Sequence, residues 1–565
     1  MKPEFLTWPH QNEDRRQCNV DHHDIVTNIV GLVAEIDGEY PGPTYVLDAV
    51  VDTAPIGDAH LWTNGNPFSG HIEEVDAGAS GANSRKLLYG RGAADSKVAA
   101  AIFIEVATAL TKQKAEMQGK LVLFFDAAEH TGKFEGVKSF LRHYNPEDIA
   151  GVMIGYPGDN TLNIGSRGFE RSTVNIQVGT MEGEDVGNYD ATTITQSSVI
   201  KKLGQFLNTL QEFEFSECVD KELDFNLPPK RTLTALSTVS KETLVHVPKD
   251  HSQFRIRIGG TSFHSGSSRK HGGVNAIMKL AKILIGISES RLSSPSSPGN
   301  GKRNILILDL NTLNDGFSII PDAVELVLAW YPTQITNEAE EEGPISDSLT
   351  QREAYEIISE VVDSIHGKYP SKGSSYVKLM SDEEKLQRQQ LRIGPKEDDS
   401  FSLEVMSALS INIDTRTTPT LFGIQESQRH LSDIINKQLS KHTNNVIQQM
   451  SVSHQDAWPA FSLESDHPLR TSMEYAIQQV RSQQSPSSQT QHSTQPTIRS
   501  LTSKASGPSN VGNLLAKYGV PCTTGYGVFY ENMHATNEHI DLATIYTTLD
   551  VYTTAVRHLL IREKE

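Results

Sequence analysis

The sequence is poor in cysteine: three occur in 565 residues, at Cys18, Cys218 and Cys522, with no Cys-x-x-Cys pair. This scarcity disfavours a disulfide framework and a thiolate metal site, and it indicates a reducing compartment. Long apolar runs are absent too, because the longest, near residues 276–287, is interrupted by lysines and is too short to span a bilayer. The N-terminus has no apolar signal segment. We therefore expect a soluble cytoplasmic protein with no membrane partner.

Basic residues are in the minority. Lys and Arg number 51 against 70 Asp and Glu, which gives a net charge of −19, and no long basic run occurs. A phosphate backbone attracts positive surfaces, so we expect no nucleic-acid partner. The length exceeds what one hydrophobic core usually serves, which predicts two domains with insertions.

The first part of the chain alternates apolar strand-like runs with helical periods. Such alternation is typical of an α/β sheet with parallel strands. Strands are predicted at residues 25–36, 45–51, 121–125 and 151–154, and helices at 98–110 and 134–141. Helices near residues 469–480 and 542–560 return to this character, so residues 1–172 and 455–565 are predicted to form one catalytic domain.

The middle of the chain reads as strand, helix, two strands, helix and strand, the pattern of a ferredoxin-like α+β domain over residues 173–454. Two polar segments, near residues 180–247 and 333–399, are interpreted as insertions. Strand-like endings recur on both sides of each, which extra edge hairpins or retained non-coding sequence would explain. A Gln/Ser/Pro tract near residues 482–497 is predicted to be disordered.

Three polar positions stand at the ends of predicted strands or in glycine-rich turns. Asp95 ends the turn Tyr89-Gly-Arg-Gly-Ala-Ala-Asp95, Glu129-His130 follow a buried strand, and His534 opens the run His534-Ala-Thr-Asn-Glu538. Open α/β sheets place their chemistry at strand ends of this kind. Each alone has an ordinary interpretation: a helix-capping aspartate, a solvated loop, and a surface or core imidazole. Their order and placement together favour a site.

These segments resemble the M20 family of zinc-dependent amidohydrolases and exopeptidases, the aminoacylase, carboxypeptidase G and acetylornithine deacetylase type. The resemblance implies a zinc-exopeptidase-like α/β catalytic domain with an inserted ferredoxin-like lid and dimerisation domain. It also implies two zinc ions, with Asp95 as the bridging ligand. The second residue of a Glu-Glu pair and a terminal histidine bind one ion, and these positions are His130 and His534. Glu129 takes the place of the general base.

The sequence departs from that pattern at two ligands of the other ion. Val50 stands where the family has a histidine, and Tyr156 where it has the acid of a Gly-Glu-Pro turn. We therefore expect one ion, held by Asp95, His130 and His534, with zinc favoured and cobalt or manganese as substitutes. Asp52, which normally orients the missing histidine, is left to cap a turn or to bond a neighbouring ligand. Tyr156 either bonds substrate or fills the vacated space, and we favour space-filling.

The lid motif Gly259-Gly-Thr-Ser-Phe-His264 resembles the family segment whose histidine stabilises the oxyanion, often from a partner subunit. This makes His264 a candidate catalytic residue and a homodimer through the lid the expected assembly. Its alternative is a bond to a local carbonyl. Ser318, Arg416 and Gly525 fall in segments that resemble substrate-binding loops, with Arg416 either pairing with a substrate carboxylate or forming a structural ion pair.

The predicted function is hydrolysis of an amide or peptide bond in a small amino-acid-derived substrate. Two alternatives remain: a catalytically inactive protein of the same fold that binds a ligand or partner, and an amide-forming biosynthetic enzyme. Family members usually carry a longer helical segment before the first strand, so the N-terminal helix is expected to be truncated.

Overall fold

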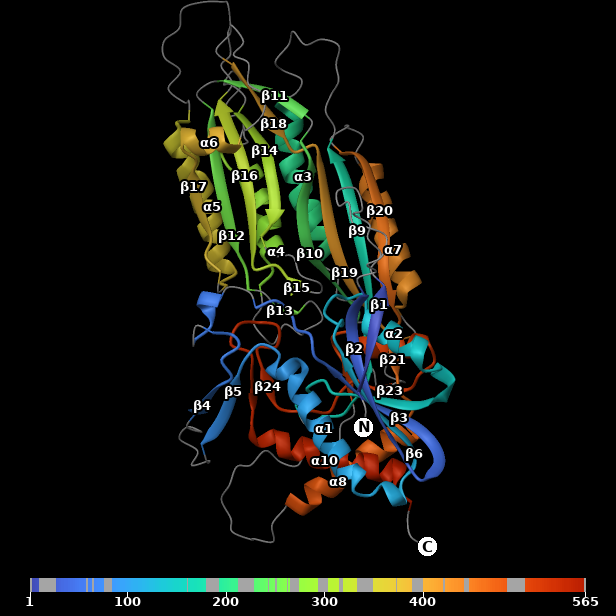
Figure 1. Cartoon of the computed structure of the whole chain (residues 1–565). Coiled ribbons are helices and arrows are strands. Elements are labelled where there is room, and N and C mark those ends of the chain that lie inside the picture. The colour runs from blue at the N-terminus through green and yellow to red at the C-terminus, as the bar shows by residue number, and fades with distance from the viewer. Residues whose placement is uncertain are drawn as a thin grey trace, which may run out of the picture.

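The computed structural model describes most of the chain. The described residues are 3–9, 27–56, 59–63, 66–75, 84–159, 161–178, 193–211, 228–241, 243–248, 251–261, 263–264, 274–292, 303–313, 319–332, 349–371, 373–388, 400–419, 422–441, 447–484 and 504–562. A six-stranded and an eight-stranded sheet organise them, and Figure 1 shows the two sheets at opposite ends of an elongated molecule. Within the described part, no helix combines the length and apolarity needed to cross a membrane.

The six-stranded sheet has the spatial order β1-β2-β6-β3-β7-β23. In chain order its strands are β1 (Pro3–Pro9), β2 (Thr27–Asp37), β3 (Tyr40–Val50), β6 (Gln118–Asp126), β7 (Ile149–Ile154) and β23 (Cys522–Thr523). The central strand β3 runs parallel to β6 and β7, and β23 runs parallel to β7. Strand β2 runs antiparallel to both of its neighbours, β1 and β6. The predicted α/β class is thus confirmed.

Helices cover both faces of this sheet. Leu47 and Ala49 of β3 join the core beneath α1 (Val98–Thr111), α8 (Pro468–Gln484) and α10 (Ala543–Leu560). Val46 and Val50 face α2 (Glu135–His143) and α9 (Val511–Lys517). Strands buried on both faces need continuous apolar runs, which is why these segments could be predicted. Residues from both ends of the chain share these layers.

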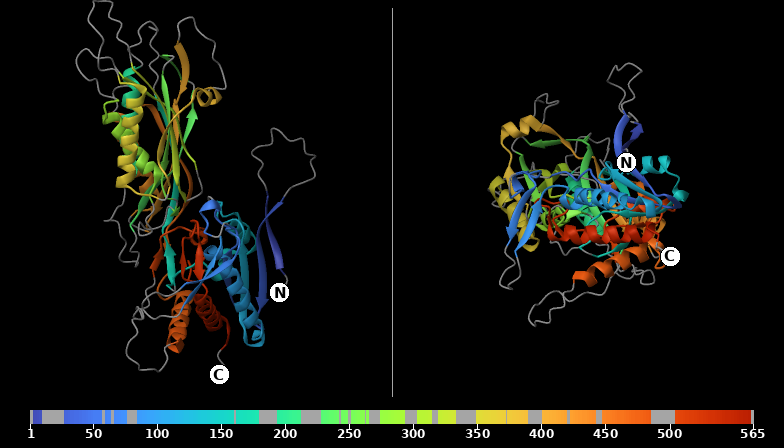
Figure 2. Two further views of the ribbon diagram at one scale, coloured as in Figure 1. Left: turned by 90° about the vertical axis from the view of Figure 1, so that its left-hand side faces the viewer. Right: turned by 60° about the horizontal axis from the view of Figure 1, so that its bottom comes forward.

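The eight-stranded sheet has the order β17-β12-β16-β14-β10-β19-β9-β20. Its strands are β9 (Gly168–Val178), β10 (Lys230–Ser240), β12 (Ser252–Gly259), β14 (Arg303–Thr312), β16 (Ala323–Pro332), β17 (Tyr376–Leu379), β19 (Ala408–Thr417) and β20 (Ile447–Trp458). One apolar core joins it to the helices α3 (Thr193–Gln211), α4 (Ala276–Glu289), α5 (Gln351–Lys368) and α7 (Ile424–Lys441). Figure 2 shows α4 and α5 lying together against one face of the sheet.

This sheet consists of two ferredoxin-like units, one nested inside the other. The outer unit runs β9-α3-β10, then β19-α7-β20, and the inner unit runs β12-α4-β14-β16-α5-β17 between them. Each follows the βαββαβ order, and each places its strands as fourth, first, third and second. The sequence predicted a single unit, and the strands assigned to it come from both of the observed units. The segments interpreted as insertions supply α3 and β10 of the outer unit and α5 and β17 of the inner one.

The two units meet where their second strands, β10 and β14, lie side by side. Only Ser237 and Asn311 are in register there, and side chains make many of the bonds. The N–H of Thr238 donates to Asn311 Oδ1 at 3.1 Å, and the Thr312 hydroxyl donates to the Leu236 carbonyl at 3.2 Å. Hydrogen bonds between side chains and backbone therefore help to join the two units of this one chain.

Shorter elements complete the structure. One small sheet, β24-β25-β5-β4, positions part of the candidate site and is described below. The remaining elements are β8 (Asn163–Ser166), β11 (Thr243–Pro248), β13 (Phe263–His264), β15 (Ile319–Ile320), α6 (Asp382–Arg388), β18 (Ser400–Val405), β21 (Phe461–Ser462) and β22 (Lys504–Ser506).

Candidate metal centre

Two parallel strand ends position the first part of the site. β3 and β6 end at the same edge of the sheet, with Val50 opposite Asp126. Asp52 follows β3, and Glu129 and His130 follow β6. The backbone N–H groups of Glu129 and His130 donate to the two carboxylate oxygens of Asp52, at 3.2 and 2.9 Å. Asp52 thereby fixes the turn that carries both residues.

A four-stranded sheet positions the rest. Its strands are β4 (His71–Val75), β5 (Arg85–Tyr89), β24 (Tyr530–Glu531) and β25 (His539–Asp541). Tyr89, the last residue of β5, pairs with His539, the first of β25. The glycine turn that leads to Asp95 and the loop that holds His534 therefore leave this sheet next to each other. His534 adopts φ +63, a left-handed conformation that few non-glycine residues occupy.

The structure brings together three of the predicted ligands, which come from separate loops. His534 Nε2 lies 2.8 Å from Asp95 Oδ2, and His130 Nε2 lies 3.4 Å from the same oxygen. The two Nε2 atoms are 3.2 Å apart. Donors about 2.0–2.1 Å from a tetrahedral zinc ion lie about 3.3 Å from one another. The three atoms thus have the spacing of ligands around a single small cation.

The charges of the cluster also suit a cation. Burial lowers the pKa of His130, but the carboxylates of Glu129, Asp52 and Asp95 outweigh that effect and raise it to about 11. Burial alone would raise the pKa of Asp95, yet the two histidines hold it well below its usual range. A positive charge is therefore strongly favoured at this place, and a divalent ion can supply it.

The Asp52 carboxylate also lies close to the imidazole of His130. Its Oδ1 is 3.4 Å from Nδ1 of His130, which has no hydrogen-bond partner among the described residues, so the contact is electrostatic. A bond to a neighbouring candidate ligand was one of the two roles predicted for Asp52, and it is seen at the backbone N–H of His130. The same carboxylate also holds the turn at Glu129.

Asp52→Asn is expected to weaken metal binding by about 10–100-fold, because the amide lacks the negative charge beside His130. Competition against a chromophoric chelator measures the affinity. The exposed Asp550→Asn in α10 is the matched control and should bind as the unaltered protein does. Equal affinities for the two variants would show that Asp52 has no part in holding the ion.

Glu129 lies beside the three ligands without joining them. Its Oε2 is 3.3 Å from His130 Nδ1, and its Oε1 accepts a hydrogen bond from the Tyr156 hydroxyl at 2.9 Å. Burial raises the pKa of Glu129 to about 7, and the charges of Asp95 and Asp52 act in the same direction. A carboxylate with a pKa close to neutrality is suited to accept and return a proton.

Val50 and Tyr156 are the residues predicted to stand at the ligand positions of a second ion. Val50 is fully buried, and Tyr156 is 9% exposed and packs in the same core. Space-filling was the favoured interpretation of Tyr156, and its bond to Glu129 adds a polar role. Asp95 Oδ1 is buried and has no hydrogen-bond partner among the described residues.

Tyr156→Phe should keep the packing and lose the bond to Glu129. A hydrogen bond to a charged group contributes about 1.5 kcal/mol or more, so kcat is expected to fall about tenfold. Metal affinity should stay close to that of the unaltered protein, whereas thermal stability should fall because a buried hydrogen bond to a carboxylate is lost. A variant with unchanged kcat would reduce Tyr156 to a packing residue.

Of the candidate lid and substrate-binding residues, the structure describes some fully and others in part or not at all. His264 lies on β13, which pairs with β15 through His264 and Ile319, but its side chain is outside the described part. Ser318 is also outside the described residues. Gly525 has φ +123, and a Cβ there would come within 2.5 Å of the Tyr156 carbonyl oxygen. A glycine is therefore required where this loop passes Tyr156.

Arg416 is buried on β19, with 1% of its surface exposed. Its guanidinium group lies over the ring of Phe169, 4.8 Å from the centroid, and donates to the Ser509 hydroxyl. Burial lowers its pKa to about 10. The neighbouring Asp414 forms its close ion pair with Arg171, at 2.8 Å. Arg416 thus links the larger sheet to the loop at Ser509.

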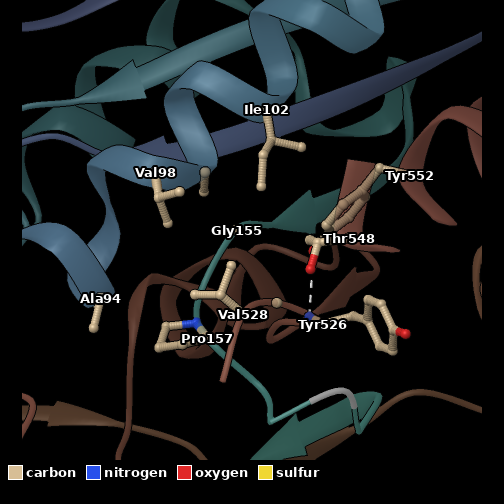
Figure 3. Close-up of a pocket in the computed structure, with 11 residues that line it drawn as sticks. Ala94, Val98, Ile102, Gly155, Pro157, Tyr526, Val528, Thr548 and Tyr552 are labelled. Carbon is tan, nitrogen blue, oxygen red and sulfur yellow. Dashed lines mark hydrogen bonds between the residues drawn. The ribbon is translucent and has the colours of Figure 1, made fainter. Parts of the chain in front are cut away.

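A small cavity lies behind the Asp95 turn. Its volume is about 10 Å³. Figure 3 shows α1, Gly155 and Tyr526 around it. The N–H of Tyr526 donates to the Tyr552 hydroxyl at 3.2 Å (Figure 3). Ligand pockets are typically ~300–1,000 Å³, so this space cannot hold a substrate.

The sequence interpretation gave no role to Arg91 and Glu538. Both are buried and they contact each other between the Asp95 turn and the His534 loop. A signal was present, because both residues stand inside the motifs that supplied the ligands. Their pairing was not readable, since 447 positions separate them.

A family model described as peptidase family M20/M25/M40 matches residues 47–558. The chain belongs to this family. The predicted membership is confirmed, and the matched range includes all three converging residues. Members of the M20 family depend on metal ions, which agrees with the candidate group at Asp95, His130 and His534.

Individual M20 relatives are distant. Succinyl-diaminopimelate desuccinylase of Rickettsia canadensis is 30% identical over 135 residues, which are 22% of this chain and 32% of that protein. The Rickettsia bellii enzyme of the same name is 31% identical over 126 residues, 21% and 29% of the two chains. The matches therefore span about a third of the curated relatives.

Solved M20 structures align over more of the chain at low identity. The metallo-carboxypeptidase Sso-CP2 of Sulfolobus solfataricus is 14% identical, covers 94% of this chain and 87% of that one, and has a TM-score of 0.42. Human carnosine dipeptidase 1 is 11% identical. The alignment covers 99% of this chain and 87% of that one, with a TM-score of 0.41.

Proposed function

We propose that this M20 protein hydrolyses an amide or peptide bond, using one metal ion held by Asp95, His130 and His534. The observation that carries the proposal is the convergence of three ligand atoms from separate loops, 2.8–3.4 Å apart, beside a buried carboxylate that is not a ligand. Two imidazoles and one carboxylate leave a fourth position open, as catalytic zinc sites do.

The donor set fits zinc, and cobalt or manganese would serve as substitutes. A divalent ion bound here supplies Lewis acidity, which makes water more acidic and polarises a carbonyl group. The high pKa of His130 agrees with a cluster arranged for positive charge, as does Asp95 Oδ1, which has no hydrogen-bond partner among the described residues. A single ion is proposed because Val50 and Tyr156 offer no ligand equivalent to the histidine and carboxylate of the family.

Glu129 performs the proton transfers in this proposal. Its carboxylate accepts a proton from the attacking water and later delivers it to the nitrogen of the leaving amine. The Tyr156 hydroxyl holds one Glu129 oxygen, and Asp52 holds the Glu129 backbone. His264 is proposed to stabilise the oxyanion, with Arg416, Ser318 and Gly525 proposed to contact substrate.

The names of the relatives suggest a class of substrate for this protein. The curated relatives are named desuccinylases, and solved M20 structures include dipeptidases and a carboxypeptidase. We propose small N-acyl amino acids or dipeptides. Release of free amine from N-succinyl, N-acetyl and dipeptide substrates by zinc-loaded protein tests this proposal.

That assay, together with a test for amide formation from paired amine and acid, also separates the alternatives. An inactive binding protein would release no amine from any substrate, and a biosynthetic enzyme would form the amide from paired amine and acid. His534→Ala removes one ligand and is expected to lose both bound zinc and activity. Activity that survives this change, or survives chelation, would contradict the single-metal proposal.

The nested lid bears on the expected homodimer. The inner unit, which carries His264, already covers the β10 edge of the outer unit. We propose that one chain therefore supplies His264 to its own site, while a dimer can still form at other surfaces. Mixing Glu129→Gln with His264→Ala protein distinguishes the cases, since recovered activity would require a histidine from a partner.

A further inference from the structure

Glu538 is buried between two of the proposed ligands. It is fully shielded from solvent, and it stands four residues after His534. Its Oε1 accepts from the backbone N–H of Ala94 at 2.9 Å and from that of Asp95 at 3.3 Å. Its own carbonyl accepts from the N–H of Gly90 at 3.0 Å. One glutamate thus holds both ends of the turn that leads to Asp95.

Arg91 makes the reciprocal connection. It belongs to the Asp95 turn, and it donates through Nη1 to the Glu538 carboxylate and through Nη2 to the Ala535 carbonyl at 3.1 Å. Ala535 directly follows His534. The guanidinium group also lies over the ring of Trp62, 5.4 Å from its centroid. Each loop therefore grips the backbone of the other through a buried charged side chain.

This arrangement matters most for Asp95. Its Oδ1 has no hydrogen-bond partner among the described residues, and its Oδ2 faces only the two histidines. The hydrogen bond between Oδ2 and His534 Nε2, at 2.8 Å, joins two atoms that would both bind the ion, so it cannot orient the carboxylate once the ion is held. The position of the Asp95 backbone, which Glu538 holds, has to do so.

We propose that Glu538 and Arg91 are positioning residues that set the separation of Asp95 and His534 for the metal ion. The inference rests on the single-metal site proposed above. A buried ion pair is a weak source of stability, because desolvation of both charges offsets their attraction. Its use here is geometric, since carboxylates and donors around metal ligands tune the affinity of the site.

The test compares cobalt binding by metal-free proteins. Glu538→Gln keeps the shape of the side chain and loses its charge, and we expect it to weaken Co²⁺ binding by about 10–100-fold. The visible absorption of bound Co²⁺ should also change, because Asp95 and His534 no longer approach the ion at the same separation. A merely structural residue would lower thermal stability and leave that spectrum unaltered.

Glu170→Gln is the matched control. Glu170 is equally buried and accepts bonds from Ser172 and Ser427, but it lies in the larger sheet. It should bind Co²⁺ as the unaltered protein does. Glu538→Asp is the second variant in case Glu538→Gln does not fold: it keeps the charge but is too short to hold the Asp95 backbone unchanged.

The outcomes separate this inference from the proposed function. If the unaltered protein binds no Co²⁺, both fail. If it binds Co²⁺ and either folded Glu538 variant matches its affinity and spectrum, the single-metal site stands and the positioning role is wrong. Weaker binding with an altered spectrum in a Glu538 variant, and neither in Glu170→Gln, supports the inference.

Discussion

Glu129→Gln is expected to lower kcat by about 10²–10⁴-fold and to leave one bound metal ion in place. The amide retains the size of the side chain and can still meet the Tyr156 hydroxyl, but it cannot accept a proton from water. Because none of the three converging donor atoms belongs to Glu129, zinc affinity should change far less than kcat.

The measurement pairs steady-state kinetics with metal analysis of the same preparations. Glu105→Gln, on the exposed face of α1, is the control and should retain full activity. A Glu129→Gln protein with undiminished kcat would remove the proposed base and leave the ion to act without it. A variant that loses its metal would instead make Glu129 a ligand.

The three proposed ligands could be singled out in the sequence because each stands in a local pattern that resembles an M20 motif. Asp95 ends a glycine turn, His130 follows an apolar strand, and His534 opens a short polar run. Parallel strands end at a common edge, so the approach of Asp52 to the Glu129-His130 turn was accessible in principle. The spacing of the donor atoms could not be predicted from the sequence, since it depends on the pairing of β5 with β25.

What the sequence did not reveal depends on contacts between distant segments. The bond from Tyr156 to Glu129 follows from how two loops pack, and the bonds of Glu538 to the Asp95 turn join opposite ends of the chain. The second ferredoxin-like unit was missed for another reason. Its helix α5 and strand β17 lie in a charged segment whose apolar stripe, with Ala354, Ile358 and Val362 buried, is narrow.

Restoring the second metal position is the other large expected effect. In a protein carrying both Val50→His and Tyr156→Glu, we expect the bound zinc to rise from about one to about two ions per chain. The M20 pattern supplies the reason, because these substitutions return an imidazole and a carboxylate to positions around Asp95. The buried Oδ1 of Asp95, which has no partner among the described residues, would be available as a further ligand for the second ion.

Stability provides the second readout. Without metal, the double variant buries two unpaired polar side chains where Val50 and Tyr156 packed, and it should melt well below the unaltered protein. Zinc should recover much of that loss, since a ligand that binds only the folded state stabilises it. Tyr156→Glu alone is the control and should stay at one ion. Two ions in the unaltered protein, or one in a folded and zinc-saturated double variant, would mean that the residues at 50 and 156 do not decide the number of ions.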